Sequence, residues 1–351
     1  MEYSQDQAYN TLCEFFKANE DAVVEIEVLP SALSPADSLV LQDGVNIGIP
    51  KTLLVQAYLK AHSLFFLRAN DPTNELTACE ASKIMLLFDP EHLTAANFRK
   101  RRLIKLQDES MKDTEINMSR EIRRELLFLD SIVTSPLHRQ TKSPTLWFHR
   151  YWLVSNMLIN TMSFASYDEL YSSFVKPELE IVFKAGERHP MNYYAWRYAN
   201  RLMKRLHTLD EHSHDEQFDL AIKYIYRPAT MIVENWCLQH PSDHSGWSFL
   251  HFMLHSFSPL PELITCKIID YTLKLQLENE STWGFIRIIV AEGFIPGGSQ
   301  ENIIQRLIEY ENKRYTIDKT AREISSSSQI CNQNPCRKAI NWIEKNKQNI
   351  Q

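Results

Sequence analysis

The most direct candidate for metal chemistry is a pair of histidines, His251 and His255, in the segment HFMLH. Four residues apart on a helix, both imidazoles would lie on one face, a spacing that can ligate zinc. A zinc site also needs a third ligand, and the segment lacks the glutamate of the HExxH motif. We therefore expect a structural role for this pair and no metal site in this chain.

The densest basic run consists of five residues, Arg99, Lys100, Arg101, Arg102 and Lys105. Such a run could bind an anionic partner, for example an acidic subunit surface or a membrane lipid. A solvated helix face is the favoured alternative, since the chain carries 38 Lys+Arg against 44 Asp+Glu. Nucleic acid is a weaker partner because no aromatic residues interleave the run.

The six cysteines do not form a CxxC pair, and their scattering indicates free thiols in a reducing, cytoplasmic compartment. We expect the closely spaced Cys331 and Cys336 to be incidental. The N-terminus is polar and acidic, unlike a signal peptide. The apolar stretch 53–67 is broken by polar residues and does not predict a transmembrane helix.

The elements that position these residues are predicted to be mostly helical. Only 8 of 351 residues are glycine, against a typical share of about 7%, which leaves few positions for tight hairpins or phosphate loops. Hydrophobic periodicity predicts a helix over 4–20, a strand or extended arm over 22–29 and a loop over 30–49. Further helices are predicted over 51–69, 72–88, 92–106, 119–134, 144–162, 166–183, 192–207, 215–226, 228–239, 245–256, 261–277, 281–292 and 299–313. A polar linker over 325–335 and a helix over 336–348 complete the chain. We expect three regions, with boundaries 1–50, 51–315 and 316–351.

Four helices begin alike, with a polar start, a tryptophan about one turn in, and a basic residue or histidine after it. The tryptophans are Trp147, Trp196, Trp247 and Trp283, and Ala96 takes the same column in a weaker fifth copy. This repetition predicts stacked helical hairpins, each burying its indole against a neighbour. Arg150, Arg201 and Arg287 follow one turn later, and we expect them to point along a similar face and bond neighbouring repeats or a partner subunit. We expect Asn192 to cap its helix or bond between repeats.

The segments KSPTLWFHR (142–150) and NYYAWR (192–197) resemble the repeat signature of the protein prenyltransferase α-subunit family. The arm at 27–54, with 86–103, is similar to the α-like subunit of type III geranylgeranyltransferases within that family. The resemblance implies an all-α fold, a right-handed superhelical crescent of helical hairpins with a short extended N-terminal arm. It also implies an α-like subunit that pairs with a separate catalytic β subunit and is inactive alone.

In this family the β subunit holds zinc and binds the isoprenoid, so no cofactor is expected on this chain and geranylgeranyl diphosphate would be the co-substrate. The protein substrate would carry C-terminal cysteines, and the type III resemblance extends to proteins already farnesylated, including a SNARE. Farnesyl and geranylgeranyl transfer both stay open, because isoprenoid length is selected in the β subunit.

By position, Lys142 matches the family lysine that reaches the diphosphate, and Tyr193 and Tyr194 match a Tyr-His pair beside it. An ammonium there would stabilise charge on the leaving group. A solvated lysine and ordinary aromatic packing are the alternatives. Pro144, where the family has Tyr, and Ala96 depart from the pattern. A helical scaffold that binds a partner without catalysis is therefore the alternative function.

Overall fold

The computed structural model describes residues 4–33, 35, 38–69, 71–110, 115–159, 164–210, 220–257, 261–293, 295–324 and 334–347. Its internal contacts divide the chain into two compact units, one of Met1–Ser163 with Glu180–Leu206 and one of Phe164–Leu179 with His207–Gln351. Cys331 and most of the predicted polar linker lie outside the described residues. The three regions predicted from the sequence stay a prediction.

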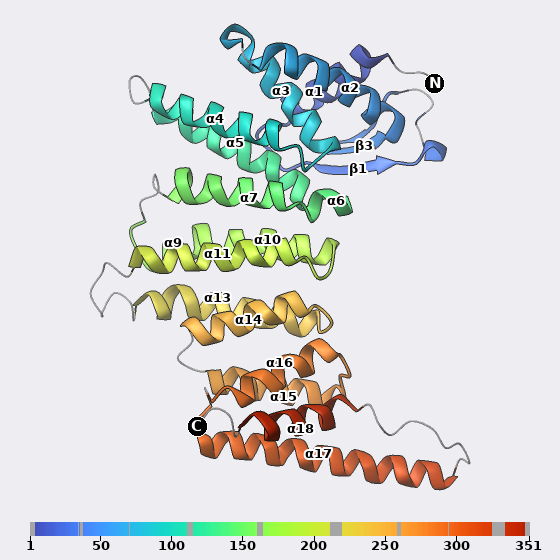
Figure 1. Ribbon diagram of the computed structural model, residues 1–351, viewed down its shortest axis with the longest axis vertical. Helices are drawn as coiled ribbons and strands as arrows, with labels where there is room; N and C mark the ends of the chain where they lie inside the picture. The colour runs from blue at the N-terminus through green and yellow to red at the C-terminus, as the bar shows by residue number, and fades with distance from the viewer. Residues whose placement is uncertain are drawn as a thin grey trace. The chain divides into compact units, whose positions relative to one another are not determined.

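The first unit contains a small sheet and a series of helices (Figure 1). Its helices are α1 (Gln5–Ala18), α2 (Lys51–Arg68), α3 (Glu75–Phe88), α4 (Leu93–Ser110), α5 (Glu115–Val133), α6 (His138–Thr141), α7 (Pro144–Leu153), and most of α10 (Lys176–Arg188) and α11 (Tyr193–Asp210). The second unit contains α9 (Tyr167–Leu170), α13 (Arg227–Gln239), α14 (His244–Phe257), α15 (Pro261–Lys274), α16 (Glu280–Ala291), α17 (Gly297–Ile324) and α18 (Pro335–Lys347). The chain therefore has the all-helical repeat fold that the sequence predicts, with one small sheet.

The sheet combines three strands, β1 (Glu25–Leu29), β2 (Leu41–Asp43) and β3 (Asn46–Pro50), in the order β1-β3-β2. β1 pairs with β3 in parallel and β2 pairs with β3 antiparallel. Alternation along β1 buries Ile26, and Ile47 and Ile49 of β3 are buried with it. Gly44 turns between β2 and β3 with φ +58°, a conformation that glycine adopts without strain.

The prediction of a loop over 30–49 is therefore wrong for residues 41–43 and 46–49, which form β2 and most of β3. Its signal is weak because Gly48 and Pro50 interrupt the short alternating segment, and glycine and proline normally disfavour strand interiors. The pairing of β3 with β1 is parallel and non-local, so no hairpin motif in the sequence predicts it. Helix α17 also runs to Ile324, beyond the predicted end at residue 313.

The four tryptophans are buried, each no more than 3% exposed. Each lies four residues after the capping residue of its helix and donates its backbone N–H to that residue's carbonyl; the caps are Ser143, Asn192, Asp243 and Asn279. Three indoles also donate to a carbonyl six residues earlier, Trp147 to Thr141 O at 2.7 Å, Trp247 to Pro241 O at 3.1 Å and Trp283 to Leu277 O at 2.8 Å. The feature that recurs in these three repeats is thus a hydrogen bond from the indole to the turn that starts its helix.

Those same turns are bonded to the preceding repeat. The Asn192 amide donates to Thr141 O at 3.0 Å, and its side-chain oxygen accepts from the Ala195 N–H. In the second unit the Thr282 hydroxyl donates to Pro241 O at 2.9 Å. Thr141 O and Pro241 O therefore each accept one bond from their own repeat's indole and one from the next repeat, which fixes the stacking of neighbouring hairpins.

Two helices continue through a proline by widening the turn before it. A π-helical turn over Tyr171–Val175 precedes Pro177, and another over Ile222–Tyr226 precedes Pro228. Proline lacks the N–H that closes an α-helical turn and clashes with the carbonyl four residues back. A π-turn at this point accommodates that clash. The break predicted between 226 and 228 is therefore absent, and α13 follows the π-turn directly.

We predict that Asn192→Ala lowers the free energy of unfolding by about 1–2 kcal/mol, because it removes both a helix cap and the bond to the preceding repeat. Urea unfolding followed by circular dichroism would measure the change. Asn279→Ala is the matched control, since Asn279 occupies the same capping position without a side-chain cap bond. Equal losses in the two variants would contradict the role assigned to Asn192.

Candidate functional site

Lys142 lies in the turn between α6 and α7, directly before the cap Ser143. Its ammonium donates to Pro190 O at 3.1 Å, in the turn that leads into α11. Since Asn192 in that turn bonds back to Thr141, the two turns are held side by side. The structure therefore places Lys142 beside the N-terminus of α11, which starts with Tyr193 and Tyr194.

Tyr193 is 55% exposed, and its hydroxyl accepts a hydrogen bond from Arg197 Nη1 at 2.8 Å. The Tyr193 and Tyr194 rings meet edge to face, with centroids 5.4 Å apart. Tyr194 faces a groove between α7 and α11, whereas Tyr193 stays on the surface. The phenol of Tyr193 can donate a hydrogen bond to an anion as well as accept one.

The groove has a volume of about 210 Å³. It is lined by Pro144, Trp147, Phe148 and Tyr151 of α7 and by Tyr194, Arg197, Tyr198 and Arg201 of α11. The Arg201 guanidinium lies 4.1 Å from the Tyr151 ring centroid and 5.5 Å from that of Phe148. These cation–π contacts hold the charge at the groove without a carboxylate.

Arg197 was missed by sequence reasoning. The available signal is the stripe Tyr194, Arg197 and Arg201, at offsets of three and four residues on one helix face. Across the described ranges, no carboxylate lies within 4.0 Å of Lys142, Arg197 or Arg201. Three cations whose charge is not neutralised by a neighbour can attract an anion with several oxygens, such as a phosphate or diphosphate.

The expectation that Arg150, Arg201 and Arg287 share a face is wrong. They follow their tryptophans by three, five and four residues, and each residue turns a helix by about 100°. Arg150 is buried, donates to Asp130 Oδ1 at 2.7 Å and to the Tyr198 hydroxyl, and therefore joins helices inside the first unit. Arg287 lies at the surface of the second unit and donates to Glu280 Oε1 at 2.6 Å.

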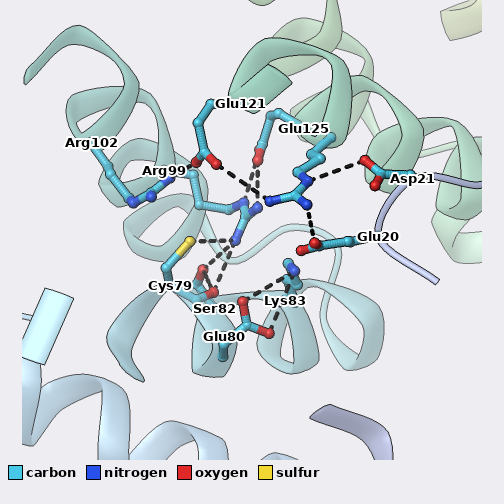
Figure 2. Close-up of polar contacts among 11 residues, drawn as sticks. Glu20, Asp21, Cys79, Glu80, Ser82, Lys83, Arg99, Arg102, Glu121 and Glu125 are labelled. Atoms are coloured by element: carbon cyan, nitrogen blue, oxygen red, sulfur yellow. Dashed lines mark hydrogen bonds and ion pairs between the residues drawn. The ribbon is translucent and has the colours of Figure 1, made fainter. Parts of the chain in front are cut away.

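The basic run on α4 is mostly neutralised within the protein. Figure 2 shows Arg99 and Arg102 directed at the carboxylates of Glu125 and Glu121 on α5. Lys105 pairs with Glu75 at 2.6 Å, and Lys100 lies 4.5 Å from the Phe148 ring centroid. The predicted solvated helix face is therefore wrong for Arg99, which is buried, and the internal ion pairs disfavour an anionic partner for the run.

Arg99 is the centre of this network. It is 3% exposed and donates through Nε to Glu125 Oε1 at 2.8 Å, through Nη1 to Cys79 O at 2.9 Å and to Ser82 Oγ at 2.8 Å, and through Nη2 to Glu125 (Figure 2). Burial alone would raise the pKa of Glu125, but Arg99 and then His149 lower that pKa to about 2. Glu125 therefore stays ionised and fixes α4 to α5.

His149 is fully buried, with Nε2 3.3 Å from Glu125 Oε1. Its two ring nitrogens make no hydrogen bond with any residue that the structure describes. Burial lowers the pKa of His149 to about 4, an effect that Glu125 opposes. The imidazole is therefore neutral in the folded protein at physiological pH.

The histidine pair lies on α14 as expected, with the ring centroids of His251 and His255 6.3 Å apart. His251 contacts Glu292 rather than a metal-ligand set. Within the described ranges no three His, Cys, Asp or Glu side chains gather as a metal site. The cysteines of the described segments, Cys13, Cys79, Cys237, Cys266 and Cys336, are free thiols.

The sequence is similar to that of curated proteins that share one name. A human protein named protein prenyltransferase alpha subunit repeat-containing protein 1 is 26% identical over 201 residues, 55% of this chain and 42% of the human protein. A Xenopus laevis relative, repeat-containing protein 1-B, is 24% identical over 181 residues, 49% of this chain and 36% of its own length. The chain is therefore similar to proteins named prenyltransferase alpha subunit repeat-containing proteins.

The aligned region covers less than half the length of these curated relatives. A family model described as the ECM9 middle domain matches residues 151–259, which include α11 with Tyr194, Arg197 and Arg201. No described helix is both long and apolar enough to cross a membrane. The repeats named in these relatives agree with the helical repeat fold of this chain.

We predict that stability falls as the pH is lowered from about 6.5 to about 4, because the unfolded chain protonates His149 in this window and the folded chain does not. The loss from this one group approaches about 3 kcal/mol. Below about 4.5 the protonation of Glu125 in the unfolded chain continues the same trend.

Urea unfolding at pH 7, 6, 5 and 4.5 would measure this dependence. His149→Met should flatten it across pH 6.5 to 4.5, whereas His62→Met, at an exposed histidine, should leave it unchanged. An unaltered slope in His149→Met would show that the buried imidazole does not control the acid sensitivity.

Proposed function

We propose that this chain is the α-like subunit of a heterodimeric protein geranylgeranyltransferase of the type III kind, acting in the cytoplasm. It would pair with a zinc-containing β subunit and transfer an isoprenoid to C-terminal cysteines of a protein substrate, including substrates that already carry a farnesyl group. The proposal is supported by the curated relatives and by one observation on the site. Lys142 lies beside the turn that starts α11, and Arg197 and Arg201 of α11 line the adjacent groove; none of the three has a carboxylate partner in the described structure.

In the proposed reaction the substrate cysteine attacks the first carbon of geranylgeranyl diphosphate. A carbon–sulfur bond forms, the carbon–oxygen bond breaks, and diphosphate leaves with the bonding electron pair. The zinc of the β subunit would hold the substrate sulfur as a thiolate, which is the reactive nucleophile. The groups of this chain would act at the other end of the substrate, where the departing diphosphate accumulates negative charge.

Lys142 would contact the diphosphate by exchanging its bond to Pro190 O for one to a diphosphate oxygen. Its ammonium donates three hydrogens, so the carbonyl contact can also persist and orient the side chain. The Tyr193 hydroxyl would donate to a second oxygen while Arg197 holds the ring and phenol in place. Tyr194 replaces the family's histidine and supplies a phenol without positive charge. Positioned donors of this kind stabilise developing charge more in the transition state than in the ground state.

A partner-binding scaffold without catalysis is the second candidate. It is favoured by Pro144 at the first turn of α7 and by Ala96 in the tryptophan column of α4. Neither residue offers the polar contact expected at that position in an active relative. The two candidates differ in one respect, because only the catalytic one requires the ammonium of Lys142.

The test is co-expression with each prenyltransferase β subunit of the cell, isolation of the complex, and transfer from labelled geranylgeranyl diphosphate to a cysteine-bearing substrate. We expect label transfer by the complex and none by either chain alone. A chain that binds no β subunit would overturn the proposal and leave the scaffold.

We predict that Lys142→Ala lowers kcat about 100-fold while the complex still forms, since removal of one transition-state donor costs about 10²-fold or more. Lys142→Arg should retain part of the activity, because the positive charge stays. Lys184→Ala is the control, because Lys184 is a half-buried lysine that pairs with Glu25 and does not line the groove. Full activity in Lys142→Ala would exclude the assigned role of the ammonium.

A further inference from the structure

The second unit contains a larger groove, of about 620 Å³, between α14 and α16. It is lined by His244, Trp247, Ser248 and His251 of α14, by Glu280, Ser281, Gly284, Phe285, Arg287 and Ile288 of α16, and by Glu292. Trp247 and Phe285 form the apolar inner wall, with ring centroids 5.0 Å apart. A concave site of this size, with an apolar wall and few polar groups, is typical of a ligand pocket.

This groove occupies the same place in its repeat as the one between α7 and α11. The lining residues correspond when they are counted from the tryptophan of each helix. On the first helix the matched pairs are Pro144 and His244, Trp147 and Trp247, Phe148 and Ser248, and Tyr151 and His251. On the second helix they are Tyr194 and Ser281, Arg197 and Gly284, Tyr198 and Phe285, and Arg201 and Ile288. The largest reductions in side-chain volume are serine in place of Phe148 and of Tyr194 and glycine in place of Arg197. The repeat therefore opens the second groove by truncating its lining.

Gly284 is the most informative of these residues. It lies inside α16 without a positive φ, so the backbone does not require glycine there. Glycine also destabilises a helix interior relative to alanine. A Cβ at this position would meet only Arg287 Nη2, at 3.8 Å, so packing does not exclude a side chain. What glycine provides here is open space in the groove.

The charges of the groove favour a cation. Arg287 is paired with Glu280 at 2.6 Å, which neutralises both. Glu292 contacts His251 and is 33% exposed, and it stands at the carboxyl end of α16, where the helix dipole is negative. Ser248 and Ser281 donate their hydroxyls to His244 O and Ser242 O, so their oxygens remain able to accept.

We propose that this groove binds a short segment of a partner protein through an arginine or lysine side chain. The aliphatic stem lies against Trp247 and Ile288, the cationic head reaches Glu292, and the serine hydroxyls accept backbone N–H groups of the segment. Long basic side chains combine an apolar stem and a charged end in this way. The site is separate from Lys142 and does not depend on the prenyltransferase role.

The test uses the full chain labelled at isoleucine methyl groups, with the Ile288 methyl as reporter and Ile26 in the sheet as reference. The probe is the peptide acetyl-Gly-Phe-Arg-Gly-amide, compared with its citrulline and glutamate analogues and with spermidine. We expect saturable shifts at Ile288 and not at Ile26, with the citrulline peptide binding at least tenfold more weakly. Citrulline keeps the shape of arginine and removes its charge.

Two variants separate binding from folding. Gly284→Leu should fill the groove and abolish binding while the midpoint of thermal unfolding stays the same or rises. Gly298→Leu, a helical glycine with open space around it outside the groove, should bind as the wild type does.

Glu292→Gln tests the charge of the groove. This variant should remove the preference for arginine over citrulline.

Several results would overturn the proposal. These are the absence of saturable shifts at Ile288, binding that survives in Gly284→Leu, tightest binding of the glutamate peptide, or binding of spermidine tighter than that of the arginine peptide. The last result would assign the groove to a free amine in place of a protein segment.

Discussion

The constraint on which this fold depends is that each Trp-bearing helix begins in a turn whose carbonyls must find donors. A buried carbonyl without a donor costs as much as a lost hydrogen bond. The indole of the same repeat satisfies that need at Trp147, Trp247 and Trp283. The next repeat donates to the same carbonyls, Thr141 O and Pro241 O. These carbonyls therefore take part both in fixing the start of a helix and in stacking one hairpin on the next.

That arrangement explains how much of the architecture could be predicted. The tryptophan column and the cap before it are local patterns, and they predict the helices and their hairpin repetition. The pairing of β3 with β1 depends on residues some twenty positions apart, which no local period reports. The continuation of the helix through Pro228 could not be predicted either, because the widened turn that accommodates proline has no simple sequence signature.

The candidate site divides in the same way. Lys142, Tyr193 and Tyr194 were named as site residues from the family resemblance, and their place at the starts of α7 and α11 follows from the repeat caps that they adjoin. The basic run on α4 could not be interpreted from α4 alone, since Glu125 and Glu121, which neutralise it, lie on another helix. The grooves were hidden as well, because they combine side chains from two helices about fifty residues apart in the first unit. The two grooves occupy corresponding positions in their repeats, but the side chains that line them differ in size and charge.

The prolines have a consequence for how the chain acquires order during synthesis. A helix interrupted by proline forms poorly by itself, since short helices already lack stability in isolation. Pro177 and Pro228 lie in the helices that precede the caps Asn192 and Asp243. Each of these helices emerges from the ribosome before the tryptophan of its hairpin does. Its folding therefore waits for the following helix, and the hairpin, rather than the single helix, is the smallest segment that emerges ready to fold.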